Sequence, residues 1–414
     1  MNVNIKLPNI KEDDYIIVAT SGGPDSMAML DMIKEENFNI VVANVNYKTR
    51  PESDVEQEEV GRYASIHNMI YESRVATGYD KGNFEAWARD FRYEFFKELY
   101  DKYNAKYLFV AHNLDDFIET YYIQKERNIV TRFYGINYIT NIFGMDVCRP
   151  VLEIEKKRLE EYCDENGVFY SIDSSNLSDD YLRNRIRHNI VSLMTLEEKR
   201  DLYKEIMDMN MVIGRKFSVV DYLYDKYVVD DVLDESFVNV YDAEYVLFKY
   251  LKMKHMSSSR LKDIIKKIKS KKNIIIELDD EYSLVKEYSK IKKVKIDNSE
   301  YSYVLDHLEY LDTEYFWISN VGDGKHRLLV KHSDFPLTVR NAREDDVVYM
   351  KHGTKKINRV FIDSKIGIQN RKRWPVVVNK DGIILLVSGL TKNYNYSNSR
   401  DDYDVELFVY EKEI

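Results

Sequence analysis

The first third of the chain alternates short apolar runs with longer amphipathic stretches. Runs rich in β-branched and aromatic residues predict four buried strands, at residues 15–20, 39–47, 69–75 and 106–113. The stretches between them predict helices over residues 24–37, 53–67 and 83–104, and a further helix from Asp115 onward. Ser53 and Glu56 have the spacing of a capping box, which would begin the second of these helices. Repeated β-α units with apolar strands indicate an α/β fold, in which helices cover both faces of a parallel sheet.

The rest of the chain changes its pattern twice. Up to about Asp312 it is mostly helical and highly charged, with one strand-like run at residues 273–278. After about Arg327 short apolar runs dominate, and residues 376–387 predict a β-hairpin. At 414 residues the chain is too long for one compact core. We therefore expect three domains: an α/β domain over residues 1–195, a mainly helical domain over 196–326 and a small β-rich domain over 327–414.

Composition narrows the class of protein. Hydrophobic residues make up 44% of the chain and charged residues 32%, which is ordinary for a soluble globular protein. No apolar run reaches the roughly 18 residues that span a bilayer, and the N-terminal residues have no apolar signal core. We therefore expect a cytoplasmic protein with no membrane partner. The two cysteines, Cys148 and Cys163, lack the spacing of a zinc or redox site and are expected to be semi-buried thiols.

Charge is segregated along the chain. The formal net charge of −10 argues against a protein that coats nucleic acid non-specifically. Residues 351–374, however, contain eight Lys or Arg against a single acid, Asp363. Such a segment indicates either a local nucleic-acid contact or a solvated surface.

The loop after the first expected strand has the composition of a phosphate-binding turn. It consists of Ser21, Gly22, Gly23, Pro24, Asp25 and Ser26. The two glycines allow a sharp turn and close approach of the backbone to a ligand, so that several N–H groups can face one anion at a helix N-terminus. Pro24 suits the first helical position, the two serines add hydroxyl donors, and Asp25 can position Mg²⁺ or the α-phosphate. A capped β-α turn without a ligand is the alternative, but the complete string after a hydrophobic strand favours phosphate binding.

Other polar residues fall at the same expected sheet edge. Asn46 and His112 lie at strand ends, and ligands of parallel sheets bind outside the carboxyl ends of the strands. Asp115, Asp116 and Glu119 follow at helical spacing. These acids could hold Mg²⁺ on a departing pyrophosphate or bind an amine, although Asp115 and Asp116 could instead only complement a helix N-terminus.

Arginines form two further candidate groups. Arg183 and Arg187 share a helical face that suits contact with phosphates of ATP or RNA, with a solvated helix face as the alternative. Arg89 and Arg92 lie on the expected helix at 83–104, where surface salt bridges are as good an interpretation as a functional contact.

The loop at residues 21–26 resembles the signature of the PP-loop ATP pyrophosphatases, which split ATP into AMP and pyrophosphate to activate an oxygen on a substrate. Within that superfamily, several stretches resemble motifs of the tRNA(Ile)-lysidine synthase family: residues 44–59, 83–96, 111–120, 173–176, 183–188, 339–366 and 373–390. The likeness covers about 15–195 and 335–392. Two positions depart from the family pattern: Asn113 replaces the second His of H-H-x-D-D, and the segment after Thr120 lacks the usual glycine-rich loop.

The resemblance implies an ATP- and Mg²⁺-dependent ligase with a PP-loop domain and tRNA-binding or linking domains after it. It would adenylate the wobble cytidine of a CAU-anticodon isoleucine tRNA and join free L-lysine to it, and the sequence leaves a homodimer open. The site residues it implies are Asp25, Asp115, Asp116 and Arg185 for catalysis; Ser21 to Ser26, Asn46 and His112 for ATP; Asp25 and Asp115 for Mg²⁺; and Arg183, Arg187, Lys355, Lys356, Arg371 and Lys372 for tRNA.

Two alternatives remain open at this point. A tRNA thiolase would use the same adenylation but needs cysteines that this chain does not space suitably. A non-catalytic, nucleotide-sensing RNA-binding protein would not need Asp25 or the pair Asp115 and Asp116.

Overall fold

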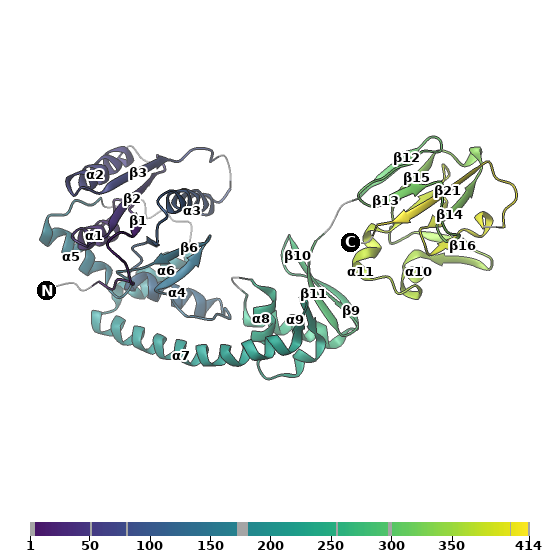
Figure 1. Ribbon diagram of the computed structural model, residues 1–414. Coiled ribbons are helices and arrows are strands. Elements are labelled where there is room, and N and C mark those ends of the chain that lie inside the picture. Colours follow the sequence, from purple (N-terminus) through teal and green to yellow (C-terminus); the bar gives the residue numbers. More distant parts are fainter. Residues whose placement is uncertain are drawn as a thin grey trace. The chain divides into compact units, whose positions relative to one another are not determined.

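The computed structural model describes residues 5–49, 52–79, 82–171, 181–253, 256–296, 300–397 and 399–412. The chain forms two compact units (Figure 1). One comprises residues 1–220 with 254–259, and the other comprises 221–253 with 260–414. No helix within the described ranges is long and apolar enough to cross a membrane.

The first unit is built on a six-stranded sheet of order β3-β2-β1-β4-β6-β5. The strands are β1 (Tyr15–Ala19), β2 (Asn39–Asn46), β3 (Ile70–Val75), β4 (Tyr107–Phe109), β5 (Ile139–Ile142) and β6 (Met145–Cys148). All neighbours run parallel except β5, which pairs antiparallel with β6. The expected parallel α/β fold is therefore confirmed. The hairpin of β5 and β6 was not predicted, because its two strands are only four residues long and partly polar.

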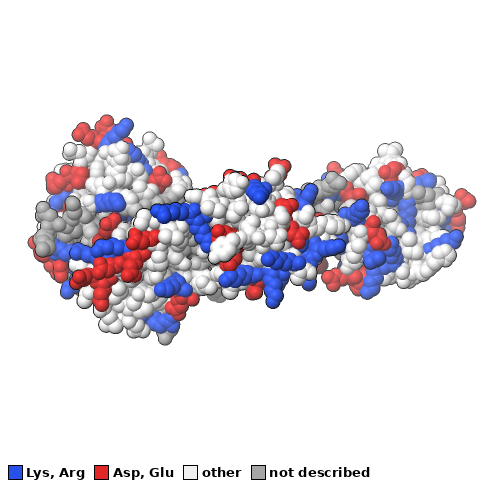
Figure 2. Space-filling view, turned by 90° about the horizontal axis from the view of Figure 1, so that it is seen from below, with Lys and Arg blue, Asp and Glu red and all other residues white. Residues whose placement is uncertain are grey.

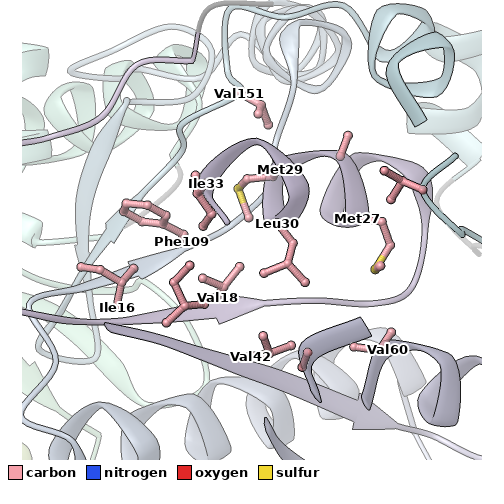
Figure 3. Close-up of a cluster of buried hydrophobic side chains, with 14 of the residues drawn as sticks. Ile16, Val18, Met27, Met29, Leu30, Ile33, Val42, Val60, Phe109 and Val151 are labelled. Atoms are coloured by element: carbon pink, nitrogen blue, oxygen red, sulfur yellow. The ribbon is translucent and has the colours of Figure 1, made fainter. Parts of the chain in front are cut away.

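Helices cover both faces of this sheet, as expected. The helices of this unit are α1 (Pro24–Ile33), α2 (Ser53–Ile66), α3 (Phe84–Lys102), α4 (Leu114–Glu126), α5 (Lys156–Asn166) and α6 (Tyr181–Asn189). Of these, α4 and α6 pack together in a separate cluster. Side chains alternate along a strand, so Ile16 and Val18 pack with α1, α2 and α5 on one face, while Ile17 packs with α3 on the other. Figure 3 shows the first of these layers, in which Met29 and Leu30 of α1 lie over Val18. This packing holds the start of α1, and with it the loop at 21–26, at the edge of the sheet.

Two local expectations for this unit were wrong. Helix α1 ends at Ile33 rather than at residue 37, and turns follow it. The capping box of Ser53 and Glu56 does not form, because Glu52 occupies the N-cap position and makes no side-chain cap hydrogen bond. Ser53 instead lies buried in the first turn of α2.

The chain after α6 combines further helices with a second sheet. Its helices are α7 (Leu196–Tyr227), α8 (Ala243–Leu251) and α9 (Ser258–Ser270). The sheet has the order β7-β8-β11-β10-β9, with β7 (Val228–Val229), β8 (Val232–Asp234), β9 (Asn273–Glu277), β10 (Tyr282–Glu287) and β11 (Lys290–Lys295). Only β9 was predicted from its pattern. Strand β11 reads KIKKVK, and its lysines hide the alternation that would reveal a strand.

The remaining residues form a β-rich part with two principal sheets, of orders β12-β15-β18-β19-β20 and β13-β21-β14, and a β16-β17 hairpin. The strands are β12 (Ser302–Leu305), β13 (Phe316–Ser319), β14 (Arg327–Val330), β15 (Leu337–Asn341), β16 (Val347–Met350), β17 (Gly353–Lys356), β18 (Pro375–Val378), β19 (Ile384–Val387), β20 (Thr391–Lys392) and β21 (Val405–Glu411). Two short helices, α10 (Ile357–Asp363) and α11 (Ile368–Arg373), lie between β17 and β18.

In this part the expected hairpin is present, but the expected domain boundary is misplaced. Strands β18 and β19 pair antiparallel around Gly382, whose φ of +77° suits glycine, as the sequence predicts. The boundary at 326/327 is misplaced, because β12 and β13 precede it and pair with β15 and β21 of the β-rich part. These two strands have only four residues each, and partners distant in sequence complete their sheets.

Candidate active site

The loop at residues 21–26 forms a compact turn at the carboxyl end of β1. Gly22 has a φ of +86°, which favours glycine. Ser21 N–H donates to Ser26 Oγ (3.2 Å), Gly23 N–H donates to Ser21 Oγ (3.3 Å), and Ser26 Oγ donates to Gly23 O (3.0 Å). Pro24 is the first residue of α1, as expected. The loop is thus preformed at a helix N-terminus, the geometry that binds phosphate.

Asp25 lies in the first turn of α1 with its carboxylate largely buried. Its Oδ1 atom is buried and has no hydrogen-bond partner among the residues that the structure describes. Burial raises the pKa of Asp25 from 3.8 to about 7, with Asp116 adding to the rise and Lys156 opposing it. An orphaned carboxylate oxygen beside a second acid is a favourable environment for a cation.

A pocket of about 210 Å³ opens beside this loop. The carboxyl ends of β1, β2 and β4 form part of its wall. His112 lines the pocket together with the loop at residues 21–26, which we call the phosphate loop. Arg89 and Arg92 of α3 also line it, together with Tyr47. Within the described ranges neither guanidinium has a carboxylate partner, and Arg89 lies over the ring of Tyr93 at 4.8 Å. The pocket therefore combines N–H donors, hydroxyls and two cations, which suits a polyphosphate.

Residues 2–194 match the family described as the PP-loop domain. A tRNA(Ile)-lysidine synthase of Ureaplasma parvum serovar 3 is 36% identical to this chain over 313 residues, which cover 70% of this chain and 92% of that protein. That of Mycoplasma mycoides subsp. mycoides SC is 30% identical over 407 residues, covering 92% and 98%. This chain belongs to the tRNA(Ile)-lysidine synthase family. The synthase of Mycoplasmopsis pulmonis is a further relative, 33% identical over 287 residues, with coverage of 68% and 97%.

Several residues implied by the family resemblance have other roles in this lysidine synthase homologue. Asn46 is buried, and its amide donates to Asp54 Oδ1 (2.7 Å) and Gln57 Oε1 (2.8 Å) while its oxygen accepts from Lys48 N–H (2.8 Å). These bonds join the end of β2 to α2. Asn46 does not line the pocket described above, so the expectation that it binds ATP is not supported.

Asp115 is also committed to a structural contact. Its Oδ1 accepts from Lys199 Nζ (2.6 Å), and its Oδ2 accepts from the backbone N–H of Lys156 (3.1 Å). Lys199 is buried and also pairs with Glu155 at 3.2 Å. Both carboxylate oxygens of Asp115 are therefore engaged, which argues against the expectation that it holds Mg²⁺ or lysine.

Asp116 does not line the pocket described above, but it is close enough to Asp25 to raise the pKa of that residue. It forms a capping box with Asn113: Asn113 Oδ1 accepts from Asp116 N–H, and Asp116 Oδ2 accepts from Asn113 N–H, both at 3.1 Å. Asn113 is thus the N-cap of α4. Asp116 Oδ1 lies 3.9 Å from Arg187 Nη2.

The arginines of α6 pair with acids of α4. Arg187 donates to the buried Glu119 at 2.6 and 3.1 Å, and Arg183 lies 3.8 Å from the same carboxylate. Arg185 forms an ion pair with Glu126 and does not line the pocket, so a catalytic role for it is not supported. The family-like stretch at 173–176 lies outside the described residues.

The residues expected to bind tRNA in the β-rich part differ in exposure. Lys356 and Lys372 are exposed. Lys355 is half-buried and pairs with Asp363 at 2.8 Å, and Arg371 is half-buried with its Nε donating to Ile366 O at 2.9 Å. Figure 2 shows Lys and Arg in separate clusters with Asp and Glu beside them, so the positive charge on this face is local.

Sequence reasoning left Arg89 and Arg92 undecided, because only the tertiary structure shows that α3 turns them toward the phosphate loop. Replacing Arg92 by Gln is expected to raise the KM for ATP about tenfold, since a charge-assisted contact to phosphate is lost. The check is the initial rate of pyrophosphate release against ATP concentration. Arg62→Gln is the control, because Arg62 is exposed on α2 and paired with Glu59. An unchanged KM in Arg92→Gln would remove this residue from the ATP site.

Proposed function

We propose that this protein is an ATP-dependent ligase that converts the wobble cytidine of a CAU-anticodon isoleucine tRNA to lysidine. The observation that carries the proposal is the pocket lined by His112 and by the phosphate loop, which includes Asp25. It lies in a chain of the tRNA(Ile)-lysidine synthase family. Two bonds are exchanged in turn. The C2 oxygen of the cytidine attacks the α-phosphorus of ATP and pyrophosphate leaves. An amine of free L-lysine then attacks C2, and AMP leaves with that oxygen.

The phosphate loop supports the first step. The N–H groups at the start of α1 and the hydroxyls of Ser21 and Ser26 are suited to hold the triphosphate. Arg89 and Arg92 supply positive charge across the same pocket, which favours the pyrophosphate as it gains charge.

Mg²⁺ fits the acids of this site. Asp25, with its unpartnered buried oxygen, would hold the ion, and Asp116 is the second acid near enough to raise the pKa of Asp25. The ion would supply neutralising charge on the departing pyrophosphate. Oxygen ligands and phosphate oxygens together match the preference of Mg²⁺.

The second step needs an uncharged amine, because a protonated lysine has no lone pair with which to attack. Asp116 is the carboxylate we assign to binding the ammonium of lysine and accepting its proton. The contacts of Asp115 with Lys199 and the Lys156 backbone argue against this role for Asp115.

The thiolase alternative is not favoured by the cysteines. Cys148 and Cys163 are both buried. Burial raises the pKa of Cys148 to about 11 and that of Cys163 to about 12, so both remain thiols at neutral pH and are poor nucleophiles.

The proposal is tested by incorporation of labelled lysine into an unmodified CAU-anticodon isoleucine tRNA transcript with Mg²⁺–ATP. We expect label that depends on ATP and on the wobble cytidine. AMP formation with tRNA but without lysine would keep the adenylation and refute lysine as the nucleophile. If folded protein forms neither AMP nor labelled tRNA, that result would contradict an enzymatic role and favour the nucleotide-sensing alternative.

Neutralising the exposed cations of the β-rich part is expected to weaken tRNA binding. In the double variant Lys356→Gln with Lys372→Gln, we expect the KM for tRNA to rise severalfold and its salt dependence to become shallower, since two phosphate contacts are lost. The KM for ATP should not change. Initial rates at two ionic strengths give both quantities, and Lys380→Gln, an exposed lysine outside the predicted set, is the control. An unchanged KM for tRNA at low salt would remove this surface from the tRNA contact.

A further inference from the structure

Arg149 is a buried cation that the proposed reaction does not use. It directly follows β6 and is only 4% exposed. Its Nη1 donates to Asn137 O (2.8 Å) and Thr140 Oγ1 (2.9 Å), which fixes the guanidinium against β5. Across the ranges that the structure describes, no carboxylate pairs with it. A buried guanidinium without an acid is costly, so its position calls for a functional explanation.

Arg149 Nη1 also lies 3.4 Å from Val147 O, and a further contact of the guanidinium is with His112. Arg149 Nε donates to His112 Nδ1 at 3.1 Å. A guanidinium has only donors, so His112 Nδ1 must carry a lone pair and cannot carry a proton. In a neutral imidazole the proton then sits on Nε2. Because His112 lines the pocket beside the phosphate loop, the Nε2–H group is the ring's remaining polar group for a ligand there.

The surroundings of His112 also keep the ring neutral. Burial lowers the pKa of His112 to about 4; Asp116 of α4 opposes this, while Arg149, Arg92 of α3 and Arg183 of α6 add to the lowering. A neutral imidazole donates a hydrogen bond without adding a charge, and its orientation depends on the partner of its other nitrogen.

We propose that Arg149 is a positioning residue that locks His112 in the neutral Nε2–H tautomer, so that the ring donates one hydrogen bond to an anionic oxygen of bound ATP. The charge of Arg149 lies behind the ring and favours the same anion without touching it. This inference rests on the proposed ATP site, and it assigns to Arg149 a role that the sequence motifs do not indicate.

The tautomer can be measured directly on the full-length protein without tRNA or lysine. Two-bond ¹H–¹⁵N correlation spectra of protein labelled with ¹⁵N-histidine distinguish Nε2–H from Nδ1–H rings. The chain has eight histidines, and the signal lost in His112→Gln identifies the ring of interest. We expect the Nε2–H pattern at pH 7. An Nδ1–H or doubly protonated pattern for that ring would overturn the proposal.

Variants at position 149 connect the tautomer to ligand binding. Arg149→Met is expected to mix the two His112 tautomers and to raise the Kd for ATP about tenfold, through loss of an oriented donor. Arg149→Lys should restore both values in part, because an ammonium is also a donor without a lone pair. Arg74→Gln is the control, since Arg74 pairs with Glu98 and stacks on Phe95. Retention of the Nε2–H pattern and of ATP affinity in folded Arg149→Met would refute the role.

Failure here and failure of the proposed function give different results. If no lysine is incorporated into tRNA but the Nε2–H pattern and the Arg149 effects on ATP binding are found, the positioning role stands. If lysine is incorporated but His112 carries its proton on Nδ1, the ligase stands and the positioning role is wrong.

Discussion

Asp25→Asn is expected to lower tRNA-dependent pyrophosphate release by about a thousandfold, the scale on which removal of one electrostatic group acts on a transition state. The buried, unpartnered Oδ1 of Asp25 is the atom we assign to Mg²⁺ on the departing pyrophosphate. An asparagine keeps the shape of the side chain but loses its charge. The measurement is the initial rate of pyrophosphate release with saturating tRNA and ATP.

The same substitution is expected to stabilise the protein in the absence of ATP and Mg²⁺. The pKa of Asp25 is raised from 3.8 to about 7 by burial, so on raising the pH the carboxyl ionises earlier in the unfolded chain than in the folded one. Stability that is present below pH 4 is therefore lost as the pH rises through 7. The amide of the variant cannot ionise, and the melting temperature of Asp25→Asn should exceed that of the wild type at pH 8, by a margin that shrinks toward pH 5.

Asp101→Asn is the matched control, because Asp101 of α3 is exposed and pairs with Lys97 one turn away. We expect it to leave the rate nearly unchanged and the melting temperature within about a degree or two. A wild-type rate in Asp25→Asn would refute the assignment of the loop. A lower melting temperature at pH 8 would contradict the burial of a charged Asp25.

Lys199→Met is expected to destabilise the protein by about 3–5 kcal/mol, the cost of removing one partner from a buried ion pair. The side chains of Lys199, Asp115 and Glu155 are 6%, 15% and 13% exposed. Without the ammonium, two carboxylates face one another in a site with little water. The free energy of unfolding, measured by urea titration, tests this.

Neutralising Asp115 and Glu155, which lose their cation in this variant, should restore its stability. Lys199→Met combined with Asp115→Asn and Glu155→Gln is expected to regain most of the lost stability, since no buried charge is then left unpaired. Lys204→Met on the same helix removes an ion pair whose lysine is 73% exposed, and should change stability by less than about 0.5 kcal/mol. If the triple variant is stable but as inactive as Asp25→Asn, Asp115 has a catalytic role after all.

Local pattern was sufficient for the core of the first unit. The apolar runs of β1 and β2 and the amphipathic stretch of α3 are encoded within single segments, and parallel pairing then brings the strand ends to one edge. The phosphate loop follows from its own six residues, because its turn and hydroxyl contacts join positions no more than five apart. The strands, the helix and the turn at residues 21–26 were predicted correctly, and phosphate binding by that turn stays a prediction.

The middle of the chain shows where pattern fails. The sheet of β7 to β11 pairs strands separated by whole helices, such as β8 with β11. In β11 only Ile291 is buried, and its four lysines make the sequence resemble a solvated charge run. Strand pairing at long range is a property of the folded chain and has no local signature.

From the sequence alone it follows that this protein has a parallel α/β domain with a glycine-containing loop before its first helix, and its motifs indicated its family. Only the tertiary structure decided which acids are available, because Asp115 meets Lys199 from a helix 84 residues away and Arg149 meets His112 across 37 residues. It also shows that Arg89 and Arg92 line the pocket, whereas Asn46 does not line it and bonds to Asp54 instead. The physical reason is that a charged or polar side chain takes its role from the partner it meets, and these partners are distant in sequence.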